Sequence, residues 1–169
     1  PAEFVGIDFS HEVTTELLWF FEGFTSYYDD LMLRRAGFVD DKGYAKLLTV
    51  NFKAVLETHA RTVQSLSEAS FDTWVKFYKP NANSANASVS YYKQGALAAL
   101  TLDAELRHRT KCKKSLDDVM RCLWTQYRTA GKKYRGETFA SPPLLKPLPA
   151  FPLKNASRNS LVPQHPSIM

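Results

Sequence analysis

Cysteine and long apolar runs are scarce in this sequence of 169 residues. The two cysteines, Cys112 and Cys122, are too few for a disulfide framework, and their spacing lacks the C-x-x-C pattern of a zinc site, so we interpret them as free thiols. No apolar run approaches the roughly 20 residues that a membrane-spanning helix needs. The first ten residues lack the basic and apolar regions of a signal peptide. We therefore predict no membrane segment and leave the compartment open.

Acidic residues are absent after Glu137, and the composition changes there. Seven of the nine prolines lie between Pro142 and Pro166, without helical or strand periodicity. We predict that residues 137–169 form an extended or disordered basic tail, while residues 1–136 form a folded unit. The formal net charge is +5, but no Lys/Arg cluster is interleaved with aromatic residues, which disfavours nucleic-acid binding.

Strand-like alternation is also missing, and helical periodicity takes its place. The fold class predicted is all-α, with about five helices. The expected segments are residues 12–36, 41–57, 65–79, 90–107 and a helix that begins at residue 115.

The third of these helices has a clear start and a clear apolar stripe. Ser65 and Glu68 match a capping box, and Pro80 ends the helix. The stripe consists of residues at i, i+3, i+4 and i+7: Phe71, Trp74, Val75 and Tyr78. Residues 80–88 are rich in Asn and Ser, and we expect a loop there.

Histidine offers no metal site on its own. The pair His11-Glu12 resembles the beginning of the zinc-binding H-E-x-x-H motif, but Thr15 occupies the position of the second histidine. His59, His108 and His165 lie too far apart in the sequence for metal-ligand spacing.

The stretch LLWFFEGFTSYYDD (residues 17–30) contains one carboxylate in an aromatic helix. Helical spacing places Glu22 on a partly polar stripe with Thr15, Ser26 and Asp29. Either Glu22 points to solvent or pairs with a cation from another helix, or it is held in an apolar wall to bind a metal ion. The residues alone favour the first interpretation.

A second candidate is the stretch SYYKQGALAAL (residues 90–100), in which two tyrosines open a helix. A tyrosine hydroxyl can donate a hydrogen bond to a developing oxyanion. The simpler alternative, which the segment alone favours, is that Tyr91 and Tyr92 pack on the core.

Both stretches resemble the glycyl aminopeptidase family of gluzincin zinc metallopeptidases. In that family the third zinc ligand is a Glu in an L-W-x-x-E-G pattern, which Leu18-Trp19-Phe20-Phe21-Glu22-Gly23 matches. The stretches VQSLSEASFDTWVKFYKPNANSANASVSYYKQGALAALTLD and SLDDVMRCLW are similar to the same family in the same order. The resemblance covers roughly residues 1–130, and it implies the helical C-terminal part of a thermolysin-like catalytic domain.

The resemblance implies roles for two residues. Glu22 would be the third zinc ligand. Tyr92 would stabilise the tetrahedral intermediate, because Tyr92-Lys93-Gln94-Gly95 matches the Y-x-K-G pattern except that Gln94 replaces its lysine. Tyr91 is the neighbour that could instead face the site.

The H-E-x-x-H helix of the family is missing from these residues and is expected just upstream of Pro1, and the family's PDZ-like domain is missing as well. We therefore expect a fragment of a zinc-dependent aminopeptidase that is inactive by itself. Its expected partners are a peptide substrate, in the intact enzyme, and the missing part of the catalytic domain. Exposed apolar surface would also favour self-association. The alternative is a non-catalytic helical binding or scaffold module.

Overall fold

The computed structural model describes residues 10–129, which are helical and contain no strand. The predicted all-α fold is therefore confirmed, while the predicted tail at 137–169 lies outside the described residues. No helix in the described range is long and apolar enough to cross a membrane. The elements are α1 (Leu18–Arg35), α2 (Asp41–Leu56), η2 (His59–Thr62), α3 (Leu66–Phe71), η3 (Thr73–Phe77), α4 (Ser84–Ala87), α5 (Tyr91–Arg109), α6 (Leu116–Leu123) and η4 (Trp124–Thr129).

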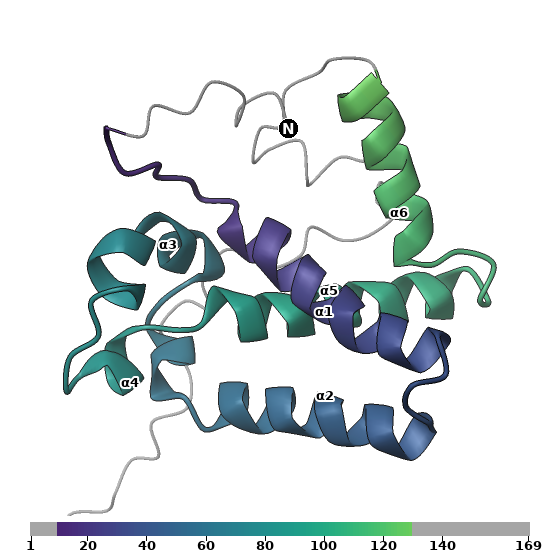
Figure 1. Ribbon diagram of the computed structural model, residues 1–169, viewed down its shortest axis with the longest axis horizontal. Coiled ribbons are helices and arrows are strands. Elements are labelled where there is room, and N and C mark those ends of the chain that lie inside the picture. Colours follow the sequence, from purple (N-terminus) through teal and green to yellow (C-terminus); the bar gives the residue numbers. More distant parts are fainter. Residues whose placement is uncertain (1–9, 130–169) are drawn as a thin grey trace, which may run out of the picture.

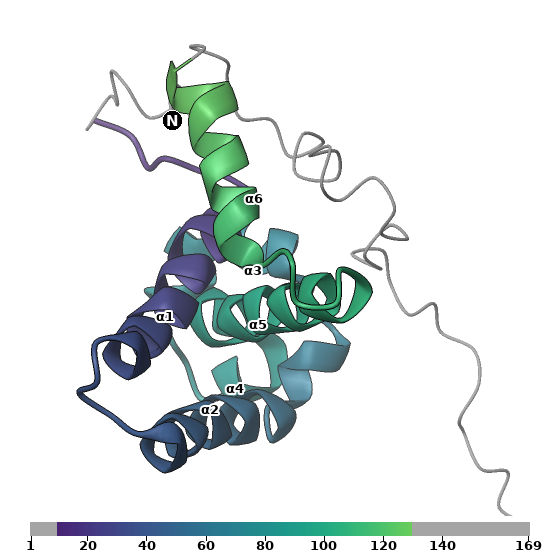
Figure 2. The ribbon, with the colours of Figure 1, turned by 90° about the vertical axis from the view of Figure 1, so that its right-hand side faces the viewer.

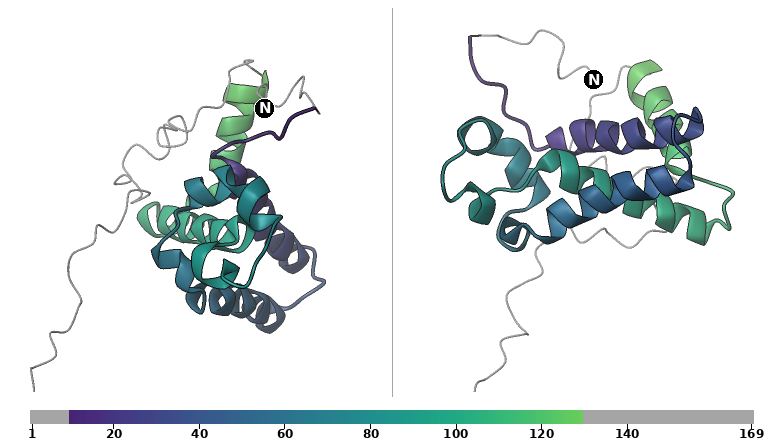
Figure 3. Two further views of the ribbon diagram at one scale, coloured as in Figure 1. Left: turned by 90° about the vertical axis from the view of Figure 1, so that its left-hand side faces the viewer. Right: turned by 60° about the horizontal axis from the view of Figure 1, so that its bottom comes forward.

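The long helices α1, α2 and α5 lie side by side, and α5 contacts both of the others (Figures 1 and 3). The short helices α3 and α4 lie near the N-terminal end of α5. Helix α6 follows the C-terminal end of α5 and stands steeply across α1 and α5 (Figure 2). The contact between α1 and α5 is the most extensive in the fold, so side chains from these two helices can lie close together.

Three helices begin within one residue of their predicted starts, and a local hydrogen bond caps each of them. The Asp40 carboxylate accepts a hydrogen bond from Gly43 N (2.7 Å) at the start of α2. Ser65 and Glu68 form both bonds of a capping box at the start of α3. The Ser90 hydroxyl accepts from Lys93 N (3.3 Å) at the start of α5. Each bond spans three residues, which is why the sequence reveals it.

The predicted start of the first helix at residue 12 is wrong, because α1 begins at Leu18. Its N-terminal turn is capped from elsewhere in the chain: Trp19 N donates to Ser70 Oγ (2.9 Å), a residue of α3. The residues before α1 lie against the η3 turn, where Trp74 Nε1 donates to Val13 O (3.0 Å). A long-range cap of this kind leaves no local signal in the sequence.

The predicted helix at 65–79 is interrupted, and the stripe expected to be its apolar face is exposed. Helix α3 ends at Phe71 and gives way to the π turn η3, which turns a different set of residues inward. The buried residues here are Leu66, Ala69, Ser70 and Thr73. The exposed set, which we call the aromatic stripe, is Phe71, Trp74, Val75 and Tyr78. The loop predicted at 80–88 also contains the short helix α4.

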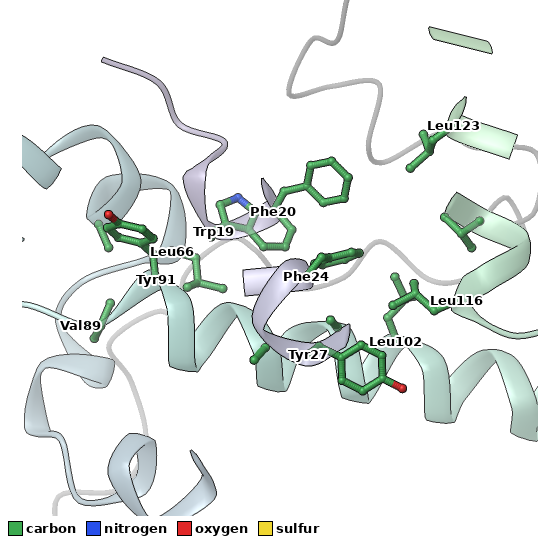
Figure 4. Close-up of a cluster of buried hydrophobic side chains, with 14 of the residues drawn as sticks. Trp19, Phe20, Phe24, Tyr27, Leu66, Val89, Tyr91, Leu102, Leu116 and Leu123 are labelled. Carbon is green, nitrogen blue, oxygen red and sulfur yellow. The ribbon is translucent and has the colours of Figure 1, made fainter. Parts of the chain in front are cut away.

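The core lies between α1 and α5 and is closed by α6 (Figure 4). The aromatic rings of α1 pack edge to face, with the ring centroids of Phe20 and Phe24 4.6 Å apart. The buried hydrophobic residues are Trp19, Phe20, Phe24, Tyr27, Ala60, Leu66, Ala69, Val89, Tyr91, Ala96, Ala99, Leu102, Leu106, Leu116, Val119 and Leu123. Cys112 and Cys122 are free thiols, as predicted.

Helices α1 and α5 touch through two glycines. A Cβ atom placed on Gly23 would lie 2.5 Å from Gly95 Cα, and one placed on Gly95 would lie 2.5 Å from Trp19 O. Both distances are far below van der Waals contact, and the atoms met are backbone atoms that no side-chain rotation can move. Only glycine therefore allows the two helix backbones to approach this closely.

One buried carboxylate joins three helices. Asp103, on α5, accepts hydrogen bonds from the Tyr27 hydroxyl (2.8 Å) on α1 and from Leu116 N (2.6 Å) at the start of α6. Arg107 Nε also donates to it (2.9 Å). Asp103 is 5% exposed, so these donors replace the water that an ionised carboxylate requires. The arrangement fixes α1 and α6 on α5.

A second carboxylate, Asp117, gives stability that depends on pH. Burial opposes its ionisation, but bonds from Arg35 and from the Tyr28 hydroxyl outweigh burial and lower the pKa of Asp117. A lowered pKa in the folded state contributes stability above the unfolded pKa, and this contribution disappears as the pH falls through the folded pKa.

We expect Arg35→Gln to raise the pKa of Asp117 and to lower the free energy of unfolding by about 0.5–1 kcal/mol at pH ~7. The difference should shrink as the pH falls through the folded pKa of Asp117, and it should vanish once Asp117 is protonated in both proteins. Urea unfolding as a function of pH measures this change. Lys53→Gln is the control, since its bridge to Glu57 joins two exposed side chains. A difference that does not shrink as the pH falls would contradict the assignment to Asp117.

Candidate active site

Glu22 lies on α1, directly before the glycine that touches α5. Its side chain is half-buried, and the structure gives its carboxylate no hydrogen bond or ion pair among residues 10–129. The alternative in which a cation from another helix neutralises Glu22 is therefore not found in the described part of the chain. A half-buried carboxylate with an available oxygen is chemically suited to bind a cation.

Tyr92 is the second residue of α5, and its side chain is half-buried. Its ring stacks on Tyr91, with centroids 4.7 Å apart, and lies 6.0 Å from the ring of Phe77. Tyr91 is different, because it is 1% exposed and packs against Phe77 at 4.9 Å. Of the two tyrosines, only Tyr92 keeps part of its surface outside the core.

The glycine contact brings Glu22 and Tyr92 together. Glu22 is next to Gly23, and Tyr92 lies one helical turn before Gly95, so both residues flank the point where the helix backbones meet. Burial raises the pKa of Tyr92, and the negative charge of Glu22 raises it further. Both effects favour the protonated phenol, the form that can donate a hydrogen bond, and the Tyr92 hydroxyl also forms hydrogen bonds with the side chains of Tyr91 and Tyr78.

The aromatic stripe reaches this same region. Phe77 contacts Tyr92 on one side, and its ring lies 5.5 Å from that of Tyr78 on the other. The sequence did not single out Phe77, whose ring packs near that of Tyr92. Its position in a π turn, a geometry often found at functional sites, is a property of the structure and not of a local motif.

A cavity of about 400 Å³ lies between the C-terminal end of α2, η3, α4 and the start of α5. Its lining includes Lys76, Lys93 and Gln94 but neither Glu22 nor Tyr92. Phe77, whose ring lies 6.0 Å from that of Tyr92, also lines the cavity, so the cavity adjoins the Tyr92 side of the pair.

The described residues do not complete a metal site. Residues 10–129 contain no group of three His, Cys, Asp or Glu side chains that could hold a metal ion. His11, His59 and His108 are exposed, and His165 lies outside the described range. Within this range, Glu22 is a single candidate ligand.

Comparison with known proteins places these residues in a family. The model of the M61 glycyl aminopeptidase family matches residues 1–98, a range that includes both Glu22 and Tyr92. A comparison with curated proteins finds no significant match.

Among solved structures, the chain is similar to the crystal structure of an aminopeptidase N family protein from Idiomarina loihiensis. The sequence identity is 38% and the TM-score is 0.81, over 89% of this chain and 25% of that one. The chain thus spans about a quarter of the length of that protein. Since the family model matches more than half of the chain, the chain belongs to the M61 glycyl aminopeptidase family.

Proposed function

We propose that this chain is the helical part of a zinc-dependent aminopeptidase, which hydrolyses the peptide bond next to a free N-terminus. The observation that supports the proposal most strongly is that Glu22, a carboxylate with no partner among residues 10–129, lies near a protonated tyrosine, Tyr92, in a chain of this family. The family's description suggests N-terminal glycine as the substrate residue, while the side-chain preference stays open.

Glu22 fits the role of one protein ligand to zinc. Its carboxylate is half-buried and has no partner among residues 10–129, and zinc accepts carboxylate oxygen as a ligand. Since the 169 residues contain no H-E-x-x-H motif, the remaining ligands and the general base would come from residues outside this sequence. When bound, the metal would supply Lewis-acid activation of the carbonyl and of water.

Tyr92 fits the role of a hydrogen-bond donor to the oxygen that gains negative charge during hydrolysis. Its raised pKa favours the protonated phenol, and packing against Tyr91 and Phe77 restricts the position of its ring. A donor that is already oriented costs no reorganisation when the charge develops. Without the other ligands, the isolated chain is expected to be inactive and to bind zinc weakly.

In the intact enzyme, we expect Glu22→Gln to weaken zinc binding by about 100-fold or more, because a neutral amide replaces a charged ligand. Metal analysis after dialysis against a graded chelator measures the change, and peptide hydrolysis should fall with the zinc content. Glu16→Gln is the matched control, because Glu16 precedes α1 and is exposed. Full zinc content in Glu22→Gln would contradict the role of Glu22.

A non-catalytic binding or scaffold module is the second candidate, and the exposed aromatic stripe favours it. Under the enzymatic proposal, the stripe is the surface on which the rest of the catalytic domain packs, and isolated chains would self-associate through it. The Glu22→Gln experiment separates the two candidates, since a scaffold would keep its binding to partners and would lose no metal.

A further inference from the structure

The close approach of α1 and α5 has a geometric consequence for the candidate active site. The two backbones meet at Gly23 and Gly95, where an added Cβ would lie 2.5 Å from Gly95 Cα or 2.5 Å from Trp19 O. A side chain on either glycine would have to push the helices apart, because the atoms it meets belong to the backbone. Any such separation also moves Glu22, on one helix, away from Tyr92, on the other.

The side chains around the crossing leave little room for the two helices to separate without moving their neighbours. Trp19, Phe24 and Tyr91 flank the crossing and are all buried. Further along the same pair of helices, the Tyr27 hydroxyl donates to the buried Asp103 carboxylate. A closely packed core transmits a displacement instead of damping it. The helix spacing at the two glycines therefore governs the geometry of the residues beside them.

We propose that Gly23 and Gly95 are positioning residues, whose missing side chains set the distance between Glu22 and Tyr92. The catalytic consequence of this inference rests on the proposed function, because the two glycines matter for catalysis only if Glu22 and Tyr92 act in it. The geometric statement can be tested without metal or substrate. Its failure is thus distinguishable from failure of the proposed function.

The test measures how strongly Glu22 and Tyr92 interact in the 169-residue chain. Protein labelled with 3-fluorotyrosine, whose phenol ionises at lower pH than that of tyrosine, is titrated by ¹⁹F NMR, and Tyr92→Phe assigns the resonance. In the otherwise unchanged chain, Glu22→Gln should lower the pKa of Tyr92, since a nearby negative charge disfavours the phenolate.

In the Gly95→Ala background, Glu22→Gln should lower the pKa of Tyr92 by measurably less, because Coulomb interaction weakens with distance. Ala99→Gly is the control, because Ala99 is buried one turn further along α5. Removal of its methyl group destabilises the helix without adding an atom at the crossing. The full effect of Glu22 should persist there. An equal effect in a folded Gly95→Ala chain would overturn the inference.

A second measurement applies if Gly95→Ala does not fold. The unmodified chain should show a strong nuclear Overhauser effect between the Hα protons of Gly23 and Gly95. Folding of Ala99→Gly together with this signal would support the contact as a requirement for the fold. Absence of the signal in the folded, unmodified chain would overturn the inference.

Discussion

Replacing Asp103 with alanine is expected to lower the free energy of unfolding by about 3 kcal/mol or more. The variant leaves the Tyr27 hydroxyl and Leu116 N without their acceptor inside the core, and each buried donor left unpaired costs about 1–3 kcal/mol. Arg107 loses its partner as well, at lower cost, because its side chain is 41% exposed. This loss is a large share of the roughly 5–15 kcal/mol that stabilises a typical domain.

Urea unfolding followed by circular dichroism at neutral pH measures this loss. Glu105→Ala is the matched control: Glu105 lies two residues away on α5 and pairs with Arg109 on a largely exposed face, so we expect a change within about 0.5 kcal/mol. Asp103→Asn should fall between the two, since its carbonyl oxygen can still accept one of the bonds. A change below about 1 kcal/mol for Asp103→Ala would show that the three helices do not depend on this carboxylate.

The second large effect concerns catalysis in the intact enzyme, where we expect Tyr92→Phe to lower kcat by about 10²–10³-fold. The substitution keeps the ring that stacks on Tyr91 and lies near Phe77, and it removes only the hydroxyl. Zinc content should stay unchanged, because Tyr92 is proposed as a donor to the reacting oxygen and not as a metal ligand. Steady-state hydrolysis of a glycyl peptide, together with metal analysis, measures both quantities.

Tyr91→Phe provides the comparison for this experiment, since Tyr91 is the neighbouring tyrosine and is buried in the core. It should alter stability more than kcat. If Tyr91→Phe lowers kcat strongly and Tyr92→Phe does not, the two tyrosines exchange roles. If neither variant changes kcat, the oxyanion donor lies outside this chain.

The sequence alone predicted only part of the candidate site. The motif around Glu22 and the motif around Tyr92 are separated by about seventy residues. Resemblance to a family supplied their roles, but periodicity alone favoured packing or solvent exposure for both. The glycine that closes each motif, Gly23 or Gly95, was the available signal that the two segments meet, because glycine inside a helix has a cost unless close packing requires it.

By itself, the sequence determined the all-helical class and the starts of α2, α3 and α5, since Asp40, Ser65 and Ser90 bond to backbone groups three residues away. Such bonds depend on neighbouring residues only. The tertiary structure decided the start of α1, which is capped by the distant Ser70, and the exposure of the aromatic stripe. It also brought Glu22 and Tyr92 near each other, because helix contacts between distant segments depend on packing that no local pattern encodes.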